Sequence, residues 1–323
     1  MARTSDATAA RLLNAAAKIT SPPRMDDLAY MARPFIQVTL PHRDPGPQPQ
    51  WHKRNGRFAM TITPYRDQSG QPRYPYGSIA RLLLFWIVTE AKRTQNRHLD
   101  LGPSMNEFMR KVGFNPDTGG GKRGDARRVR QHMLSLVRAH IVVSDGTASW
   151  LNMPLADAGQ VWWSHAAPDQ HSLFGSFIIL GEAFFQTIDS GSVPVDRRVL
   201  QHLRRSPMAL DLYTWAAYRV FTLEGRSAFI PWKRLNEQLG AGYADPGNFQ
   251  RAALGHLRRV AAFYRGLRFR VETGGVRLLP SLPAVPPRGS LPLIHGETVH
   301  APKPRPRKAA PTYPPKPTVK RYE

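Results

Sequence analysis

Two segments of the chain are apolar almost all round a helical surface, a pattern typical of helices in the middle of a domain. They span residues 78–94, where Ser78 is placed to cap the helix, and residues 207–223. After each of them the pattern predicts the same order of elements: a short extended piece, a helix, a turn, a basic helix and a β-hairpin. That order is typical of a winged helix-turn-helix. The pattern therefore predicts an α+β protein with two tandem winged-helix domains.

In the first half, local signals place the ends of these elements. Ser104 is expected to cap a helix, with Glu107 at the capping-box position, and Gly113 is expected to end it. The pair Asp145-Gly146 predicts a hairpin turn. The extended piece, the basic helix and the two hairpin strands are expected at residues 99–101, 122–140, 141–143 and 149–151.

Upstream of these elements, alternating apolar residues predict two short strands, at residues 35–40 and 58–63. Residues 42–56, between them, are rich in Pro, Gly and basic residues, which predicts a surface loop. The first 20 residues carry a few basic residues among many alanines. They are interpreted as a frayed helical leader, and a mitochondrial presequence is the alternative.

The second half repeats the predicted order of elements. Its extended piece, helix, basic helix and hairpin strands are expected at residues 229–230, 231–239, 248–264, 267–272 and 276–279. The two halves align weakly at an offset of about 130 residues, which places Phe85 on Trp215 and Leu82 on Leu212. Because identity is slight, the repeat depends on the order of elements, and chance similarity between helical proteins is the alternative.

These observations divide the chain into four predicted segments. They are a leader (1–25), a first winged-helix domain (26–183), a second winged-helix domain (184–285) and a tail (286–323). The stretch from residue 281 onwards contains eleven prolines and eight basic residues, against two glutamates. Such a composition predicts a disordered, basic, Pro-rich C-terminal tail. It is expected to attract phosphate without specificity, or to have no role.

Composition narrows the class of partner. The chain has 323 residues, no cysteine, and 46 Lys and Arg against 23 Asp and Glu, a formal net charge of +23. The charge favours an anionic partner, nucleic acid first and an acidic membrane surface second. The absence of cysteine excludes a disulfide framework, a zinc finger, an iron–sulfur site and a cysteine nucleophile, and it fits a reducing, cytoplasmic setting. The sequence contains no apolar run of about 18 residues, so no membrane span is expected.

The positive charge gathers on the two basic helices. At 100° per residue, the first helix has a front of Arg and Gln, which a major groove accepts, and a back formed by Ala126, Val129, Met133, Leu136, Val137 and His140. The second has a buried stripe (Phe249, Ala253, Leu257, Val260 and Tyr264), and Gly255 and Ala262 on its polar face would let the helix axis approach a large partner. The predicted DNA-binding residues are Arg123, Arg127, Arg130, Gln131, Arg138, Asn248, Arg251, Arg258, Arg259, Arg265 and Arg268.

A simpler interpretation is that these two charged faces only contact solvent. Solvated faces normally mix Lys with Glu at i,i+4 spacing, and these two helices lack that mixture. DNA contact is therefore the preferred hypothesis.

Signals for catalysis are weak. The run Gly119-Gly120-Gly121-Lys122 fails as a phosphate loop, because Pro116 and Arg123 stand where that motif needs Gly and Ser or Thr. The sequence has no His-x-His pair, no metal-ligand spacing of histidines and no carboxylate cluster for two metals. We therefore expect no catalytic residue, no metal and no cofactor, and Tyr74 and Tyr76 are expected to be structural.

Several blocks resemble a known family in the right order. They are YGSIARLLLFW (76–86), TEA (89–91), SMNEFM (104–109) and RRVRQ (127–131). These blocks resemble the plasmid-encoded RepA replication initiators, over roughly residues 26–280. The resemblance implies a protein that binds direct repeats (iterons) in the double-stranded DNA of a plasmid origin, helps to open the duplex, and recruits the host initiator and replicative helicase.

The resemblance also implies roles for the two domains. Residues 184–285 would make the main DNA contact, and residues 26–183 would serve dimerisation and an auxiliary DNA contact, with a homodimer in equilibrium with the monomer. A winged-helix transcriptional regulator or autorepressor is the alternative function. A nicking or priming enzyme and a basic protein that binds RNA or membrane surfaces are weaker alternatives.

Overall fold

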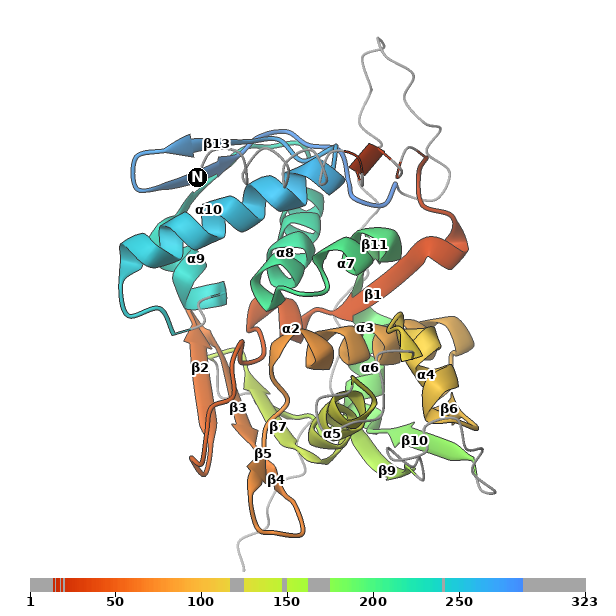
Figure 1. Cartoon of the computed structure of the whole chain (residues 1–323). Helices are drawn as coiled ribbons and strands as arrows, with labels where there is room; N and C mark the ends of the chain where they lie inside the picture. Colours follow the sequence, from red (N-terminus) through yellow and green to blue (C-terminus); the bar gives the residue numbers. More distant parts are fainter. Residues whose placement is uncertain are drawn as a thin grey trace, which may run out of the picture. The chain divides into compact units, whose positions relative to one another are not determined.

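The protein is described from a computed structural model (Figure 1). The described residues lie within the compact unit that runs from Met1 to Pro287. They are residues 14, 16–17, 19, 21–116, 125–146, 150–161, 175–239 and 242–286. Arg123, the Gly-rich run, and the predicted tail from residue 287 onwards lie outside them. The described chain combines helices with antiparallel sheets, which is consistent with the predicted α+β class.

The first half contains most of the elements that the pattern predicts. They are α3 (Gly77–Thr94), β6 (His98–Gly102), α4 (Met105–Val112), α5 (Asp125–Arg138), β7 (His140–Ser144) and β8 (Trp150–Asn152). Ser104 caps α4 by accepting a hydrogen bond from the Glu107 backbone N–H at 3.3 Å, and Gly113 ends it with φ 89°. The predicted cap of α3 is wrong, because the helix begins at Gly77, after Tyr76 as its N-cap residue.

The second half also follows the prediction. It contains α8 (Pro207–Leu223), β12 (Ala228–Pro231), α9 (Trp232–Leu239), α10 (Pro246–Phe263), β13 (Phe269–Glu272) and β14 (Gly275–Leu278). Ser206 caps α8 by accepting from the Ala209 N–H at 3.1 Å. The three strands form one antiparallel sheet in the order β12-β14-β13, against which α9 packs.

The segment before α3 differs from the prediction in two places. Residues 35–40 do not form a strand: α2 (Pro34–Gln37) begins with Pro34 in its first turn, where proline needs no N–H partner. The expected loop at residues 42–56 contains β2 (Trp51–Asn55), which pairs with β3 (Phe58–Thr63), the strand predicted at residues 58–63. The sequence of β2 is polar and does not predict a strand, because its pairing with β3 decides its conformation.

The sheet of the first half is larger than the predicted hairpin. Its order is β2-β3-β7-β8, and β3 pairs with β7 so that Met60 faces Val143 and Ile62 faces Ile141. These four side chains are buried. By contrast β6, the predicted counterpart of β12, pairs with β10 (Ser176–Leu180) in the separate sheet β6-β10-β9, which ends at β9 (Ala156–Gln160). The two halves therefore share an order of elements but not a strand pairing.

Other elements join the two halves. A 3-10 turn (Met25–Asp27) leads into β1 (Leu28–Ala32), which pairs antiparallel with β11 (Ser192–Asp196). α6 (Glu182–Gly191) precedes β11, and α7 (Arg197–Leu203) follows it. A small hairpin of β4 (Tyr65–Arg66) and β5 (Pro72–Arg73) lies between β3 and α3. β1 lies before the predicted domain boundary at residues 183/184 and β11 lies after it, so the two predicted domains share a strand pair. The boundary stays a prediction.

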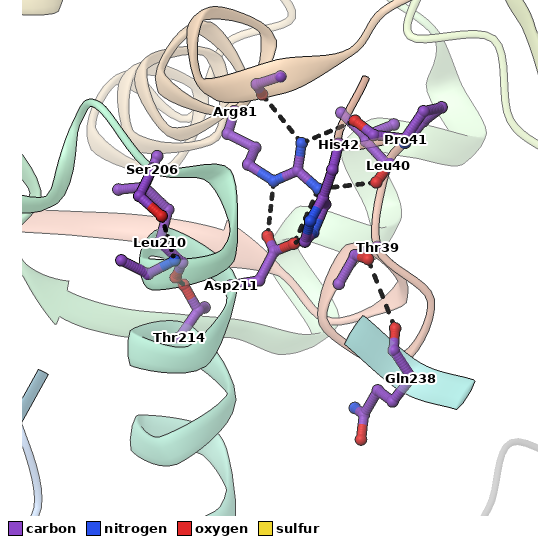
Figure 2. A network of polar contacts seen from close by, with 12 residues as sticks. Thr39, Leu40, Pro41, His42, Arg81, Ser206, Leu210, Asp211, Thr214 and Gln238 are labelled. Carbon is purple, nitrogen blue, oxygen red and sulfur yellow. Dashed lines mark hydrogen bonds and ion pairs between the residues drawn. The ribbon is translucent and has the colours of Figure 1, made fainter. Parts of the chain in front are cut away.

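A buried ion pair joins the two central helices. Arg81 on α3 donates from Nε to Asp211 Oδ1 and from Nη2 to Asp211 Oδ2, both at 2.7 Å (Figure 2). The Arg81 side chain is 2% exposed and that of Asp211 is 10% exposed. The two residues are 130 positions apart, which equals the offset of the predicted repeat. In the alignment of the predicted repeat, corresponding positions therefore carry opposite charges that meet.

Backbone carbonyls complete the partners of the Arg81 guanidinium. Nη1 donates to the Pro41 oxygen at 3.0 Å and to the Gly77 oxygen at 2.9 Å, and Nη2 donates to the Leu40 oxygen at 2.7 Å. A buried charge is tolerated only when its hydrogen-bonding groups are satisfied, and this one is. Arg81 thereby fixes the path of the chain between α2 and β2.

His42 adds a third group to the pair. Its Nε2 lies 2.7 Å from Asp211 Oδ2. Burial, together with the nearby Arg81, lowers the pKa of His42 to about 4. Burial alone would raise the pKa of Asp211, but Arg81 and His42 bring it down to about 2. At neutral pH the cluster is therefore a carboxylate, a guanidinium and a neutral imidazole.

The same segment also reaches α9. Thr39 donates to the Gln238 carbonyl at 3.4 Å, and Gln238 Nε2 donates to the Ile36 carbonyl at 2.9 Å. Lys53 of β2 donates to Thr39 Oγ1 at 3.3 Å. Figure 2 shows Thr39 and Gln238 beside the Arg81 cluster. Residues 36–42 are thus bonded to both halves.

Replacing Asp211 by Asn is expected to lower the free energy of unfolding by about 3–5 kcal/mol, because a buried guanidinium loses its counter-charge. Urea denaturation of the two proteins measures the difference. The double variant Arg81→Met, Asp211→Leu is the control and should recover most of the loss, since it removes both charges together. A loss below about 1 kcal/mol for Asp211→Asn would contradict this account of the pair.

Acid is expected to destabilise the protein through two buried histidines. Burial lowers the pKa of both His42 and His132 from 6.5 to about 4. The unfolded chain binds these protons below pH 6.5, whereas the folded chain does not until about pH 4. The free energy of unfolding should therefore fall as pH drops through this window, by up to about 3 kcal/mol per histidine. Urea denaturation from pH 7 to 4 should show a shallower slope for His42→Gln, while His52→Gln, at an exposed position, should keep the wild-type slope.

Candidate nucleic-acid interface

Helix α10 has a buried apolar face and an exposed polar face. Asp245 caps it by accepting hydrogen bonds from the backbone N–H groups of Gly247 and Asn248, at 3.2 and 2.8 Å. All five residues of the predicted stripe, Phe249, Ala253, Leu257, Val260 and Tyr264, are buried. The stripe packs against α8, so the opposite face of α10 is turned outward.

The outward face of α10 carries polar and small residues. Asn248, Arg251, Gly255 and Arg258 are exposed, and a Cβ added at Gly255 would meet nothing within 4 Å. Arg251 donates to the Asn248 side-chain oxygen at 3.1 Å, which orients both groups. From Asn248 to Arg270 the sequence contains no acidic residue. This face offers hydrogen-bond donors, positive charge and space for close approach.

Arg259 lies differently from its neighbour Arg258. Its side chain is half-buried, and Nη2 donates to the His202 carbonyl of α7 at 2.6 Å. Its Nε is buried without a hydrogen-bond partner among the described residues. The Arg259 guanidinium thus forms a hydrogen bond within the protein. Helical periodicity alone does not distinguish such an arginine from one whose side chain faces solvent.

The basic residues that follow α10 continue along the hairpin. Arg265 and Arg268 are exposed, and Arg265 Nη2 also donates to the Ala16 carbonyl at 3.0 Å. On the three-stranded sheet, Phe229, Arg277 and Arg270 form one cross-strand row. The Arg277 Cζ lies 5.5 Å from the centre of the Phe229 ring. This row was not among the predicted site residues, because only strand register brings it together.

Helix α5 presents fewer free groups than predicted. Arg127 and Arg138 are exposed, whereas Arg130 and Gln131 are half-buried. Ala126, Val129, Met133 and Leu136 are buried as predicted, and α5 packs on α3. His140, expected on the buried side of this helix, is exposed because it begins β7 instead. Arg123 lies outside the described residues.

The small hairpin β4–β5 adds an aromatic ring beside the last residue of α5. The Arg138 Cζ lies 4.7 Å from the centre of the Tyr65 ring. Tyr65 is the cross-strand partner of Arg73, whose Nε donates to Asp67 Oδ2 at 2.6 Å. The pattern of alternation is too short here, two residues per strand, for the sequence to reveal the hairpin.

Two tyrosines next to α3 have structural partners. The Tyr74 side chain is buried, and its hydroxyl donates to the Gln48 carbonyl at 2.8 Å. The Tyr76 ring packs edge-on against His132 at 4.8 Å between centres. Among the described residues, no group of three or more His, Asp or Glu side chains is placed to hold a metal ion. Within the same residues, no helix is long and apolar enough to cross a membrane.

Comparison with known proteins identifies the class of protein. Residues 74–233 match the family described as plasmid-encoded RepA protein. The match confirms the resemblance, and it places this segment, about half of the chain, in the family of plasmid replication initiators. It covers α3 to the start of α9, a shorter span than the residues 26–280 inferred from the sequence, and α10 lies beyond it.

One solved structure is similar to the fold. It is a crystal structure of domain 2 and domain 3 of RctB, with a TM-score of 0.47 and 10% sequence identity, covering 78% of this chain and 99% of the other. A search of curated proteins gave no match.

Replacing Arg258 and Arg259 separately by Ala is expected to separate DNA contact from stability. Arg258→Ala should weaken binding to the target repeat by about 1–3 kcal/mol with unfolding unchanged within about 0.5 kcal/mol. Arg259→Ala should lower the free energy of unfolding by about 1–3 kcal/mol, because the His202 carbonyl loses its donor. Fluorescence anisotropy and urea denaturation measure the two quantities. Equal effects of both variants on both quantities would contradict the assignment.

Proposed function

We propose that this protein is a plasmid replication initiator that binds repeated sequences (iterons) in double-stranded origin DNA. It does so through two winged-helix units, in which α10 and α5 enter major grooves and the hairpins β13–β14 and β7–β8 contact the backbone. Binding promotes opening of the origin and recruitment of the host initiator and helicase. The protein acts without catalysis, as a homodimer in equilibrium with a monomer.

One observation carries the proposal: the outward face of α10. It combines exposed arginines with Asn248 and the open space at Gly255, and its buried stripe holds the helix on α8. Arg pairs bidentately with guanine and Asn with adenine, so this face has the groups for reading bases as well as for holding phosphate. A surface that only solvates the protein needs neither the glycine nor the absence of acids.

The arrangement of the first half supports the second unit. α5 packs on α3 as α10 packs on α8, and a hairpin follows each basic helix. α5 begins with an acidic residue, Asp125, which pairs with Arg128, whereas the segment from Asn248 to Arg270 contains no acid. This contrast supports an auxiliary contact for residues 26–183 and the main contact for residues 184–285. The family match of residues 74–233 supports origin DNA as the target.

Footprinting on plasmid DNA tests the proposal. We expect protection of tandem repeats spaced by about whole helical turns. With about 6–10 phosphate contacts, affinity should fall roughly 10³–10⁵-fold between 50 and 200 mM salt. Uniform protection of the DNA, without protected repeats, would contradict the proposal, because a basic protein that contacts only phosphate binds all sequences alike. A minimal clone that represses its promoter but is not maintained would instead support the autorepressor.

A further inference from the structure

The hairpin β4–β5 is held rigid by its own loop. Asp67 accepts hydrogen bonds from the backbone N–H groups of Ser69 and Gln71, at 3.0 and 3.1 Å, and from Arg73 Nε at 2.6 Å. The Asp67 N–H donates to the Gln71 carbonyl at 3.0 Å, which closes the loop. These bonds hold Arg73 opposite its cross-strand partner Tyr65, the first residue of β4.

Two arginines of α5 lie near the Tyr65 side chain. Arg138 stacks over its ring, and Arg130 lies two helical turns earlier on α5. Burial raises the pKa of Tyr65, and the positive charges of Arg138, Arg73 and Arg130 oppose that rise, so all three lie within electrostatic reach of the phenol. The carboxylate of Asp67 lies in the same reach, and it is bonded to Arg73.

Arg130, Arg138 and Tyr65 have hydrogen-bond donors that are unused within the described part of the chain. Neither Arg130 nor Arg138 makes an ion pair with a described residue, and the Arg130 Nε is buried without a hydrogen-bond partner there. No described residue bonds the Tyr65 hydroxyl either. Arg138 with the Tyr65 ring against it, and Arg130 two turns away on the same helix, thus carry donors that no described residue uses, and donors with positive charge select an anion with several oxygens.

We propose that Tyr65, Arg130 and Arg138 form a phosphodiester site that takes one backbone phosphate of the DNA, beside the groove that α5 enters. The assignment rests on the proposed function and adds to it a contact that carries no base information. Stacking on Tyr65 orients the Arg138 guanidinium in advance, so less side-chain freedom is lost on binding. The hairpin then sets the register of α5 along the duplex rather than its choice of sequence.

A phosphate-by-phosphate measurement tests the site on the full chain. Duplexes that carry the target repeat are made with a single neutral methylphosphonate at each backbone position in turn. For the wild-type protein, one position near α5 should lose about tenfold in affinity. Arg138→Gln should lose about tenfold on unmodified DNA, lower the salt slope by about 0.9, and lose nothing further at that position.

Two variants separate this contact from general charge. Tyr65→Phe keeps the ring that Arg138 stacks on but removes the hydroxyl, and it should weaken all sequences equally, by a few-fold, with the salt slope unchanged. Arg197→Ala removes one exposed charge from α7 and is the matched control. For Arg197→Ala, the backbone position at which a methylphosphonate lowers affinity should be the same as for the wild-type protein.

The outcomes distinguish this site from the function on which it rests. Absence of protected repeats contradicts the proposed function. Protected repeats with no methylphosphonate position coupled to Arg138 overturn the phosphodiester site alone. Loss of discrimination at one base pair in Arg138→Gln also overturns it, because the arginine would then read a base. An effect of Arg138→Gln on competition by inorganic phosphate but not on DNA affinity overturns it too, in favour of a free-phosphate site.

Discussion

The buried ion pair between Arg81 and Asp211 is the constraint on which the arrangement of the protein depends. α5 packs on α3 and α10 packs on α8, and the pair joins α3 to α8. The pair thus helps to set the relative orientation of the two basic helices, together with the pairing of β1 with β11 and the bonds of residues 36–42 to α9. A hydrophobic contact at this point would tolerate sliding of one helix along the other, whereas a bidentate pair fixes both distance and rotation.

The pair also makes the two halves unequal. Arg81 and Asp211 are 130 residues apart, so the predicted repeat aligns them with each other. If two copies of the first half met through this surface, two guanidinium groups would face each other in a buried site, at a large electrostatic cost. Opposite charges at equivalent positions therefore favour pairing of the first half with the second over pairing of like with like.

The sequence predicted the helices and the hairpin strands well, and it missed strands whose partners lie far along the chain, for physical reasons. Local periodicity predicted α3, α4, α8 and α10, and the cap at Ser104 also marked the start of α4. The strands β1, β2 and β11 were missed because partners far along the chain decide their conformation, and the apolar residues at 35–40 proved to begin with a short helix. Of the candidate site, periodicity located the outward face of α10 but did not show that Arg259 turns back to His202 or that Tyr65 reaches Arg138. Such contacts depend on which elements become neighbours.

The pairing of β1 with β11 has a consequence for the order in which the chain is made. Leu28 of β1 pairs with Asp196 of β11, and Ala32 pairs with Ser192. At about 5–20 residues per second, β1 leaves the ribosome roughly 8–32 seconds before its partner strand has been synthesised. During synthesis the first half must therefore wait with an unpaired strand edge, which is where a chaperone would bind or a misfolded chain would begin.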